Sequence, residues 1–157
     1  MSDSGENKTM REGAQQSAVD NKSDFGHLID AIPAIVWITD PSGDCTYLNQ
    51  NWYEFTGQQE HEALGYGWLD ATHPEDKQMS ADIFLAANAA RKSFRIIYRL
   101  KRQDGQYRWC ADTGRPKFNA TGEYEGMIGT VVDIHEERMA AEKLRNTSAH
   151  LQLATSA

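Results

Sequence analysis

Residues 94–101 read Phe-Arg-Ile-Ile-Tyr-Arg-Leu-Lys. Large apolar or aromatic side chains recur at every second position, which predicts a β-strand buried on one face. A turn at 103–105 follows, and residues 107–117 and 125–134 give two further strand patterns separated by a Gly-containing turn at 119–123. Because strands joined by such short turns run antiparallel, this half of the chain predicts a three-stranded antiparallel sheet.

Toward the N-terminus the sequence predicts a second hairpin. Residues 34–39 are apolar and indicate a buried strand, residues 40–44 supply the Pro and Gly of a tight turn, and residues 45–49 form the returning strand. Short helical turns are expected over 51–57 and 62–64, each closed by a glycine.

A longer helix is predicted from Thr72 to about Lys92. Thr72 and Glu75 have the spacing of a capping box, and Pro74 lies in the first turn. The apolar positions expected to face inward are Met79, Ile83, Phe84 and Ala87. Two strands, then helices, then three strands is the order of an α+β domain, with an antiparallel sheet and helices on one face.

Length and composition indicate one domain with two flanking segments. The chain has 157 residues, of which 39% are hydrophobic and 25% charged. Residues 1–24 are mostly polar and predict a disordered or weakly helical lead-in, residues 25–134 hold the core, and residues 135–157 are rich in helix formers and predict an exit helix.

Charge and cysteine usage exclude several classes of protein. A formal net charge of −7 disfavours binding to nucleic acid or anionic membranes. The longest apolar run is too short to span a bilayer, so no membrane insertion is expected and the cytoplasm is the expected location. Cys45 and Cys110 are too few for a zinc site or a disulfide framework, and we expect buried free thiols.

The chain resembles a PAS domain with its C-terminal PAC segment, of the type found in bacterial sensor kinases and diguanylate cyclases. The matching motifs are Trp37-Ile38-Thr39-Asp40, Tyr47-Leu48-Asn49, Phe55-Thr56-Gly57, His73-Pro74-Glu75-Asp76, Asp104-Gly105, Gly114-Arg115-Pro116 and Val132-Asp133-Ile134. The resemblance implies a five-stranded antiparallel sheet in the order 2-1-5-4-3, with helices on one face that enclose a small-molecule cavity. One departure is His135, which stands where the family usually has Thr.

Catalytic and metal chemistry find no support in the sequence. No cysteine lies in residues 50–92, which excludes a light sensor that forms a covalent adduct with cysteine, and no His lies in the interior of the longer helix to bind haem. His135 and Glu136 lack the residues that complete a kinase phosphoacceptor box, and no nucleophile set, phosphate loop or metal spacing is present. We predict no catalytic residue and no bound metal.

A noncovalent ligand is compatible with the predicted interior. The residues expected around it are Asn49, Trp52, Phe55, Leu64, Met79, Ile83, Ile96, Tyr98, Leu100, Met127, Gly129 and Val131, with Asp112 as a second polar group beside Asn49. This mostly apolar and aromatic set suits either an ordinary packed core without a ligand or a planar aromatic ligand. If a cofactor is bound, the resemblance favours FAD or FMN over haem.

The pattern of the exit helix predicts either a parallel coiled coil with a partner helix or a helix that folds back on its own sheet. Ile134, Ala141, Leu144, Ser148 and Leu151 follow the a and d spacing of a coiled coil, although over fewer than three heptads. The resemblance and these features are compatible with two functions. In the first, a sensory module binds a small molecule or redox cofactor and relays the change through Asp133 and Ile134 to the exit helix of a dimer and to a kinase or cyclase output domain. In the second, a cofactor-free PAS domain acts as a homodimerisation or partner-docking element.

Overall fold

The structure is a computed structural model that describes residues 9–13 and 24–155. The chain divides into two units, one ending at Pro33 and the other beginning at Ala34. In the first unit, residues 9–13 and 24–30 are helical. The predicted lead-in over 1–24 lies largely outside the described residues. Every further element belongs to the second unit.

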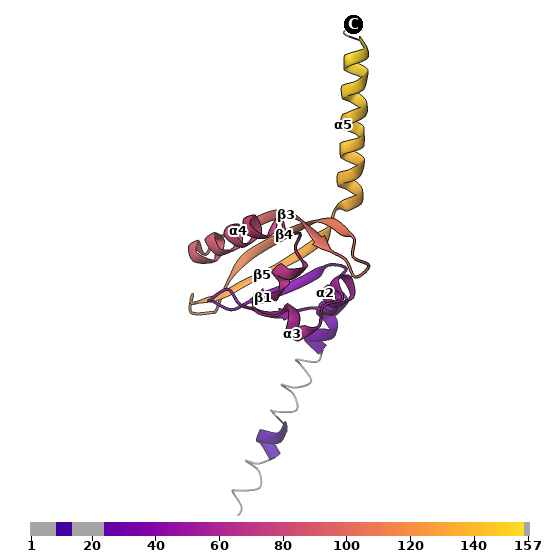
Figure 1. The fold of residues 1–157 in the computed structure, drawn as a ribbon. Coiled ribbons are helices and arrows are strands. Elements are labelled where there is room, and N and C mark those ends of the chain that lie inside the picture. Colours follow the sequence, from indigo (N-terminus) through magenta and orange to yellow (C-terminus); the bar gives the residue numbers. More distant parts are fainter. Residues whose placement is uncertain (1–8, 14–23, 156–157) are drawn as a thin grey trace, which may run out of the picture. The chain divides into compact units, whose positions relative to one another are not determined.

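Five strands form one antiparallel sheet, as predicted. They are β1 (Ile35–Thr39), β2 (Cys45–Leu48), β3 (Phe94–Lys101), β4 (Tyr107–Phe118) and β5 (Tyr124–Asp133). Their spatial order is β2-β1-β5-β4-β3, so that the first and last strands of the domain are neighbours at its centre (Figure 1). Both the antiparallel fold class and the order 2-1-5-4-3 are thereby confirmed.

Two glycines in the centre of the sheet make room for a tryptophan. Trp37 of β1 pairs with Gly129 of β5, and Gly129 pairs in turn with Gly114 of β4. A Cβ atom at Gly129 would lie 2.2 Å from the Trp37 ring, and one at Gly114 would lie 2.8 Å from it. The indole therefore lies directly against the backbone of the sheet, where it stacks on Phe94 with 5.9 Å between the ring centroids.

Four helical segments lie between β2 and β3 in the chain: α2 (Gln50–Thr56), α3 (Glu60–Ala63), the 3-10 helix η1 (Gly67–Ala71) and α4 (Lys77–Ala90). Gly57 ends α2 in a left-handed conformation with φ of 74°, as its position predicts. The side chains buried against the sheet include Trp52 of α2 and Phe84 of α4.

The predicted start of the longer helix is wrong. Thr72 is the C-cap residue of η1, which ends at Ala71, and α4 begins only at Lys77 with Asp76 as its N-cap residue. The Asp76 carboxylate makes no capping bond because it instead accepts hydrogen bonds from Arg99 of β3. A capping box does occur, but at Gln59 and Glu62 in α3.

The predicted inward face of α4 is partly wrong as well. Phe84 and Ala87 are buried, whereas Met79 and Ile83 are 42% and 36% exposed. The buried face continues through Ser80 instead, because Ser80, Phe84 and Ala87 follow the i, i+4, i+7 spacing of one helix face.

The last helix, α5 (His135–Thr155), begins directly after β5. Its first turns contact β4, but none of its residues is buried and every residue from 143 to 155 is exposed. Leu144 and Leu151, both at predicted coiled-coil positions, are 70% and 64% exposed. An amphipathic helix with its leucines in water has an apolar stripe that the described chain leaves uncovered.

Candidate functional site

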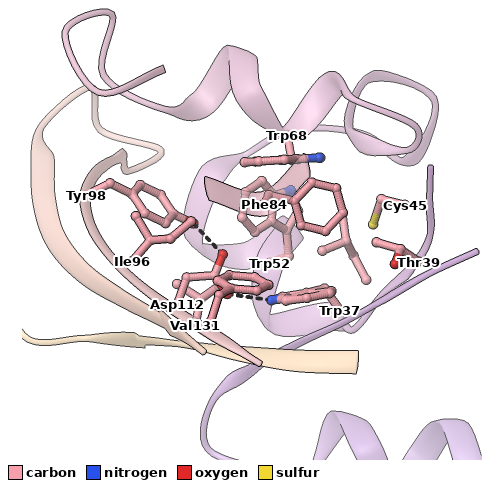
Figure 2. A pocket seen from close by; sticks show the side chains of 12 residues that line it. Trp37, Thr39, Cys45, Trp52, Trp68, Phe84, Ile96, Tyr98, Asp112 and Val131 are labelled. Carbon is pink, nitrogen blue, oxygen red and sulfur yellow. Dashed lines mark hydrogen bonds between the residues drawn. The ribbon is translucent and has the colours of Figure 1, made fainter. Parts of the chain in front are cut away.

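A small cavity lies between the sheet and the helices. Its volume is about 30 Å³, and its walls are mainly apolar and aromatic (Figure 2). The residues that line it are Trp37, Thr39, Cys45, Leu48, Trp52, Trp68, Phe84, Phe94, Ile96, Tyr98, Asp112 and Val131. Each of the five strands contributes at least one of these side chains, as do α2, η1 and α4.

One ionisable carboxyl group lies in this apolar wall. Asp112 of β4 is 7% exposed. The Trp37 indole N–H donates a hydrogen bond of 2.8 Å to its Oδ1, and the Tyr98 hydroxyl lies 3.5 Å from its Oδ2 (Figure 2). Burial raises the pKa of Asp112 to about 7, and the two hydrogen bonds only partly offset the loss of water.

The remaining acidic groups near Asp112 are neutral at ordinary pH. Burial raises the pKa of Cys45 to about 11 and that of Cys110 to about 12. Tyr98, fully enclosed, has a pKa well above its usual value for the same reason. Both cysteines are free and buried, as the sequence predicts. Asp112 is therefore the group here whose charge changes near neutral pH.

The structure brings five of the predicted site residues to the cavity wall: Trp52, Ile96, Tyr98, Asp112 and Val131. The others lie elsewhere. Leu100 and Met127 are completely buried in the core, Phe55 and Leu64 pack at its edge, and Gly129 lies beneath Trp37. Met79 and Ile83 lie on the exposed side of α4.

Asn49 has a structural role in the backbone connections of β1. Its side-chain oxygen accepts a hydrogen bond from Val36 N, and its amide nitrogen donates to Ala34 O. The side chain is completely buried but faces the strand rather than the cavity lining. It satisfies backbone groups at the start of β1 that would otherwise lack partners.

Sequence reasoning missed most of the aromatic wall, above all Trp37, Trp68 and Phe94. Trp37 could have been found, since alternation along β1 places Ile35, Trp37 and Thr39 on one face. Trp68 carries no such signal, because it lies in the 3-10 helix η1, where no period of two or 3.6 applies.

Neither flavin nor haem fits this interior. Ligand pockets for molecules of that size measure roughly 300 Å³ or more, about ten times the volume of this cavity. Three of the lining residues, Trp37, Phe84 and Phe94, pack against one another and leave no room for a flavin ring between them. No histidine lines the cavity to hold a haem iron, and among residues 9–13 and 24–155 no three His, Cys, Asp or Glu side chains gather as a metal site.

A second group of polar contacts joins the sheet to α5. Arg108 of β4 donates hydrogen bonds to Asp133 at the end of β5 and, over 2.7 Å, to Glu136 in the first turn of α5. Backbone bonds reinforce this junction, since Ile134 N donates to Trp109 O and Trp109 N donates to the Nδ1 atom of His135. The residue that departs from the family motif therefore takes part in the connection.

Two guanidinium groups from different elements lie over the ring of Trp109. The Arg99 guanidinium of β3 is 5.2 Å from its ring centroid, and that of Arg138 in α5 is 4.1 Å away. Arg99 also forms ion pairs with Glu75 and Asp76 before α4. A continuous set of contacts thus connects the start of α4 with α5 through two strands.

The sequence profile described as PAS fold matches residues 46–131, more than half of the chain, and the chain belongs to this family. PAS domains are sensor modules of signal-transduction proteins rather than catalytic units. The uncharacterized protein y4lL of Sinorhizobium fredii is 36% identical over 124 residues, which cover 79% of this chain. The peroxide stress-activated histidine kinase mak1 of Schizosaccharomyces pombe is 28% identical in an alignment of 153 positions that covers 90% of this chain.

The chain spans only 15% of the Sinorhizobium protein and 9% of the yeast kinase. Among solved structures, an RNA-binding light-oxygen-voltage receptor superposes with a TM-score of 0.66 at 19% identity, over 82% of this chain and 37% of that receptor. This likeness shows the fold. Within residues 9–13 and 24–155, no helix is long and apolar enough to cross a membrane.

Proposed function

We propose that this chain is a sensory module that passes changes in its interior to α5, and through α5 to an output domain of the kinase or cyclase type. One observation carries the proposal. Val131 lines the cavity, and Asp133, two residues further along the same strand, is held by Arg108, which also holds Glu136 of α5. A displacement of β5 by a guest therefore acts directly on the ion pairs that orient the helix.

Asp133 and Ile134 form the relay in this proposal. Asp133 accepts the bond from Arg108 and also one from the backbone N–H of His135, while Ile134 O accepts the bond from Arg138 N in the first helical turn. Because Ile134 alone separates β5 from α5, we expect a movement at the end of β5 to change the direction of α5.

The output is proposed to act through a homodimer in the cytoplasm. The exposed Leu144 and Leu151 follow coiled-coil spacing, and under three heptads would pair only weakly without continuation in a longer parent chain or support from a second interface. Sedimentation equilibrium tests this step: the wild-type chain should show self-association that the double variant L144E/L151E loses. A wild-type chain that stays monomeric at millimolar concentration would refute the dimer.

The relay is tested by hydrogen exchange in α5. Arg108→Gln removes both ion pairs to Asp133 and Glu136, and we expect amides in residues 135–142 to exchange several-fold faster while the sheet stays protected. Lys117→Gln is the matched control, because it removes an ion pair with Glu125 across the same two strands but away from α5. Equal exchange in both variants would contradict the relay.

A second function has specific support. The cavity of about 30 Å³ among packed aromatic rings favours a cofactor-free domain that serves dimerisation or partner docking. Absorbance and native mass spectrometry of the purified chain decide between the two functions. A visible chromophore would support a redox cofactor, whereas a featureless visible spectrum and a mass without ligand would support the cofactor-free domain.

A further inference from the structure

We propose that the cavity binds a small organic cation, a primary ammonium group of the size of methylammonium, with Asp112 as its counter-ion. This inference rests on the proposed sensory function, since it names the class of ligand that the interior would detect. Three features of the cavity carry it: an acceptor with spare capacity, aromatic walls and a matching size.

Asp112 has more acceptor capacity than its neighbours use. A carboxylate offers about four lone-pair positions. Among the residues that the structure describes, only Trp37 at 2.8 Å and Tyr98 at 3.5 Å donate to it, and the second distance is at the limit for a hydrogen bond. Within residues 9–13 and 24–155, Asp112 forms no salt bridge, and the titratable groups around it, Tyr98, Cys45 and Cys110, are acids. The charge of the carboxylate thus has no counter-ion from the described part of the protein.

The walls of the cavity favour a positive guest over a neutral one. Trp52, Trp68 and Phe84 lie around the space into which Asp112 points (Figure 2). The indole N–H groups of Trp37 and Trp52 are engaged by Asp112 and Gln58, so these residues offer their π-systems to a guest instead of donors. Aromatic faces attract ammonium groups, and more strongly where water is excluded.

The size of the cavity limits the guest. A water molecule requires about 10–15 Å³ measured in this way, so a cavity of about 30 Å³ holds two such groups. Methylammonium has two heavy atoms, and its N–H groups can donate to the free positions on Asp112. Methanol has the same size but no charge, and it would leave the buried carboxylate uncompensated. The neutral analogue therefore separates a cation site from a simple void.

The test follows the indole N–H resonances of the ¹⁵N-labelled 157-residue chain at pH 8. We expect methylammonium chloride to shift the Trp37 indole signal saturably, and methanol or sodium chloride at equal concentration to leave it in place. Asp112→Asn should weaken methylammonium binding by about tenfold to a hundredfold, since a hydrogen bond to a charged group is lost. Asp82→Asn, which removes an exposed carboxylate of α4, is the matched control and should bind like wild type.

A second measurement does not depend on the folding of a variant. Because the pKa of Asp112 is about 7, the wild-type chain should bind methylammonium about tenfold more weakly at pH 6 than at pH 8. Equal shifts by methanol and methylammonium, no shift by either, or unchanged affinity at pH 6 would each overturn the cation site. The sensory relay would survive that result, since the Arg108→Gln exchange experiment needs no ligand.

Discussion

Replacing Asp112 by Asn should remove a pH-dependent loss of stability. The pKa of this carboxyl group is about 7 in the folded chain, against 3.8 for an unperturbed aspartate. A raised pKa means that the folded chain holds a proton that the unfolded chain has already released. The stability contributed by this group is therefore full below pH 3.8 and is lost as the pH rises through 7.

The size of the effect follows from the difference in pKa. About three pKa units correspond to a total loss of about 4 kcal/mol, of which about 3 kcal/mol falls between pH 5 and pH 8. The amide introduced by Asp112→Asn would keep an oxygen for the Trp37 N–H and would carry no charge at any pH. The difference in unfolding free energy between the two proteins isolates Asp112, because Tyr98, Cys45 and Cys110 stay neutral over this range.

The assay is urea unfolding of both proteins at pH 5, 6, 7 and 8, followed by circular dichroism. The free energy of wild type minus that of Asp112→Asn should fall steadily up to about pH 7 and then level off. Asp82→Asn on the exposed side of α4 controls for a carboxylate-to-amide change as such. A difference that stays constant from pH 5 to pH 8 would contradict a raised pKa, because Asp112 would then be ionised throughout and hydrated in the folded chain.

Three further predictions concern the sheet, the thiols and the helix junction. Gly129→Ala should lower the free energy of unfolding, measured in urea, by about 3 kcal/mol, because the new Cβ meets the Trp37 ring. The control Gly26→Ala, where a Cβ meets nothing within 4 Å, should change it by less than about 1 kcal/mol, and equal effects would contradict the close approach of Trp37 to Gly129. Cys45 and Cys110 should react with a thiol reagent roughly a hundredfold more slowly in the native chain than in urea, because both are buried and have raised pKa values. If the native chain is labelled as fast as the unfolded chain, the two thiols are not buried. Trp109→Ala should speed amide exchange in the first turns of α5 a few-fold, because it removes the ring over which the Arg138 guanidinium lies, whereas Trp109→Phe should keep most of the protection. Equal exchange in the two variants would show that the aromatic ring does not stabilise the start of α5.

The fold was readable from the sequence because its signals are local. Alternation in residues 94–101 and the short turns after them predict antiparallel strands, and the structure forms them. The boundary of α4 was not readable, since Thr72 and Glu75 have the spacing of a capping box that the structure does not form. Asp76 is taken by Arg99, a partner 23 residues away, and a local pattern cannot report such a competitor.

The candidate site was predicted only in part for the same reason. Strand period identified Ile96, Tyr98 and Val131 as cavity residues, because alternation determines which face a side chain occupies. It could not separate cavity from solid core on that face, so Leu100 and Met127 were predicted beside the ligand although both are completely buried in packing. That distinction depends on the helices that cover the sheet.

The amino-acid sequence alone thus determined the strands, their antiparallel pairing, the buried thiols and the family, because each depends on periodicity, turn chemistry or short motifs. The size of the interior and the surroundings of the Asp112 carboxyl group depend on tertiary packing. Glycine at 114 and 129 lets Trp37 lie on the sheet, where its N–H reaches Asp112 and its ring helps to fill the interior. Cavity volume and the pKa of a buried group arise from how distant segments pack together, which no stretch of the chain encodes by itself.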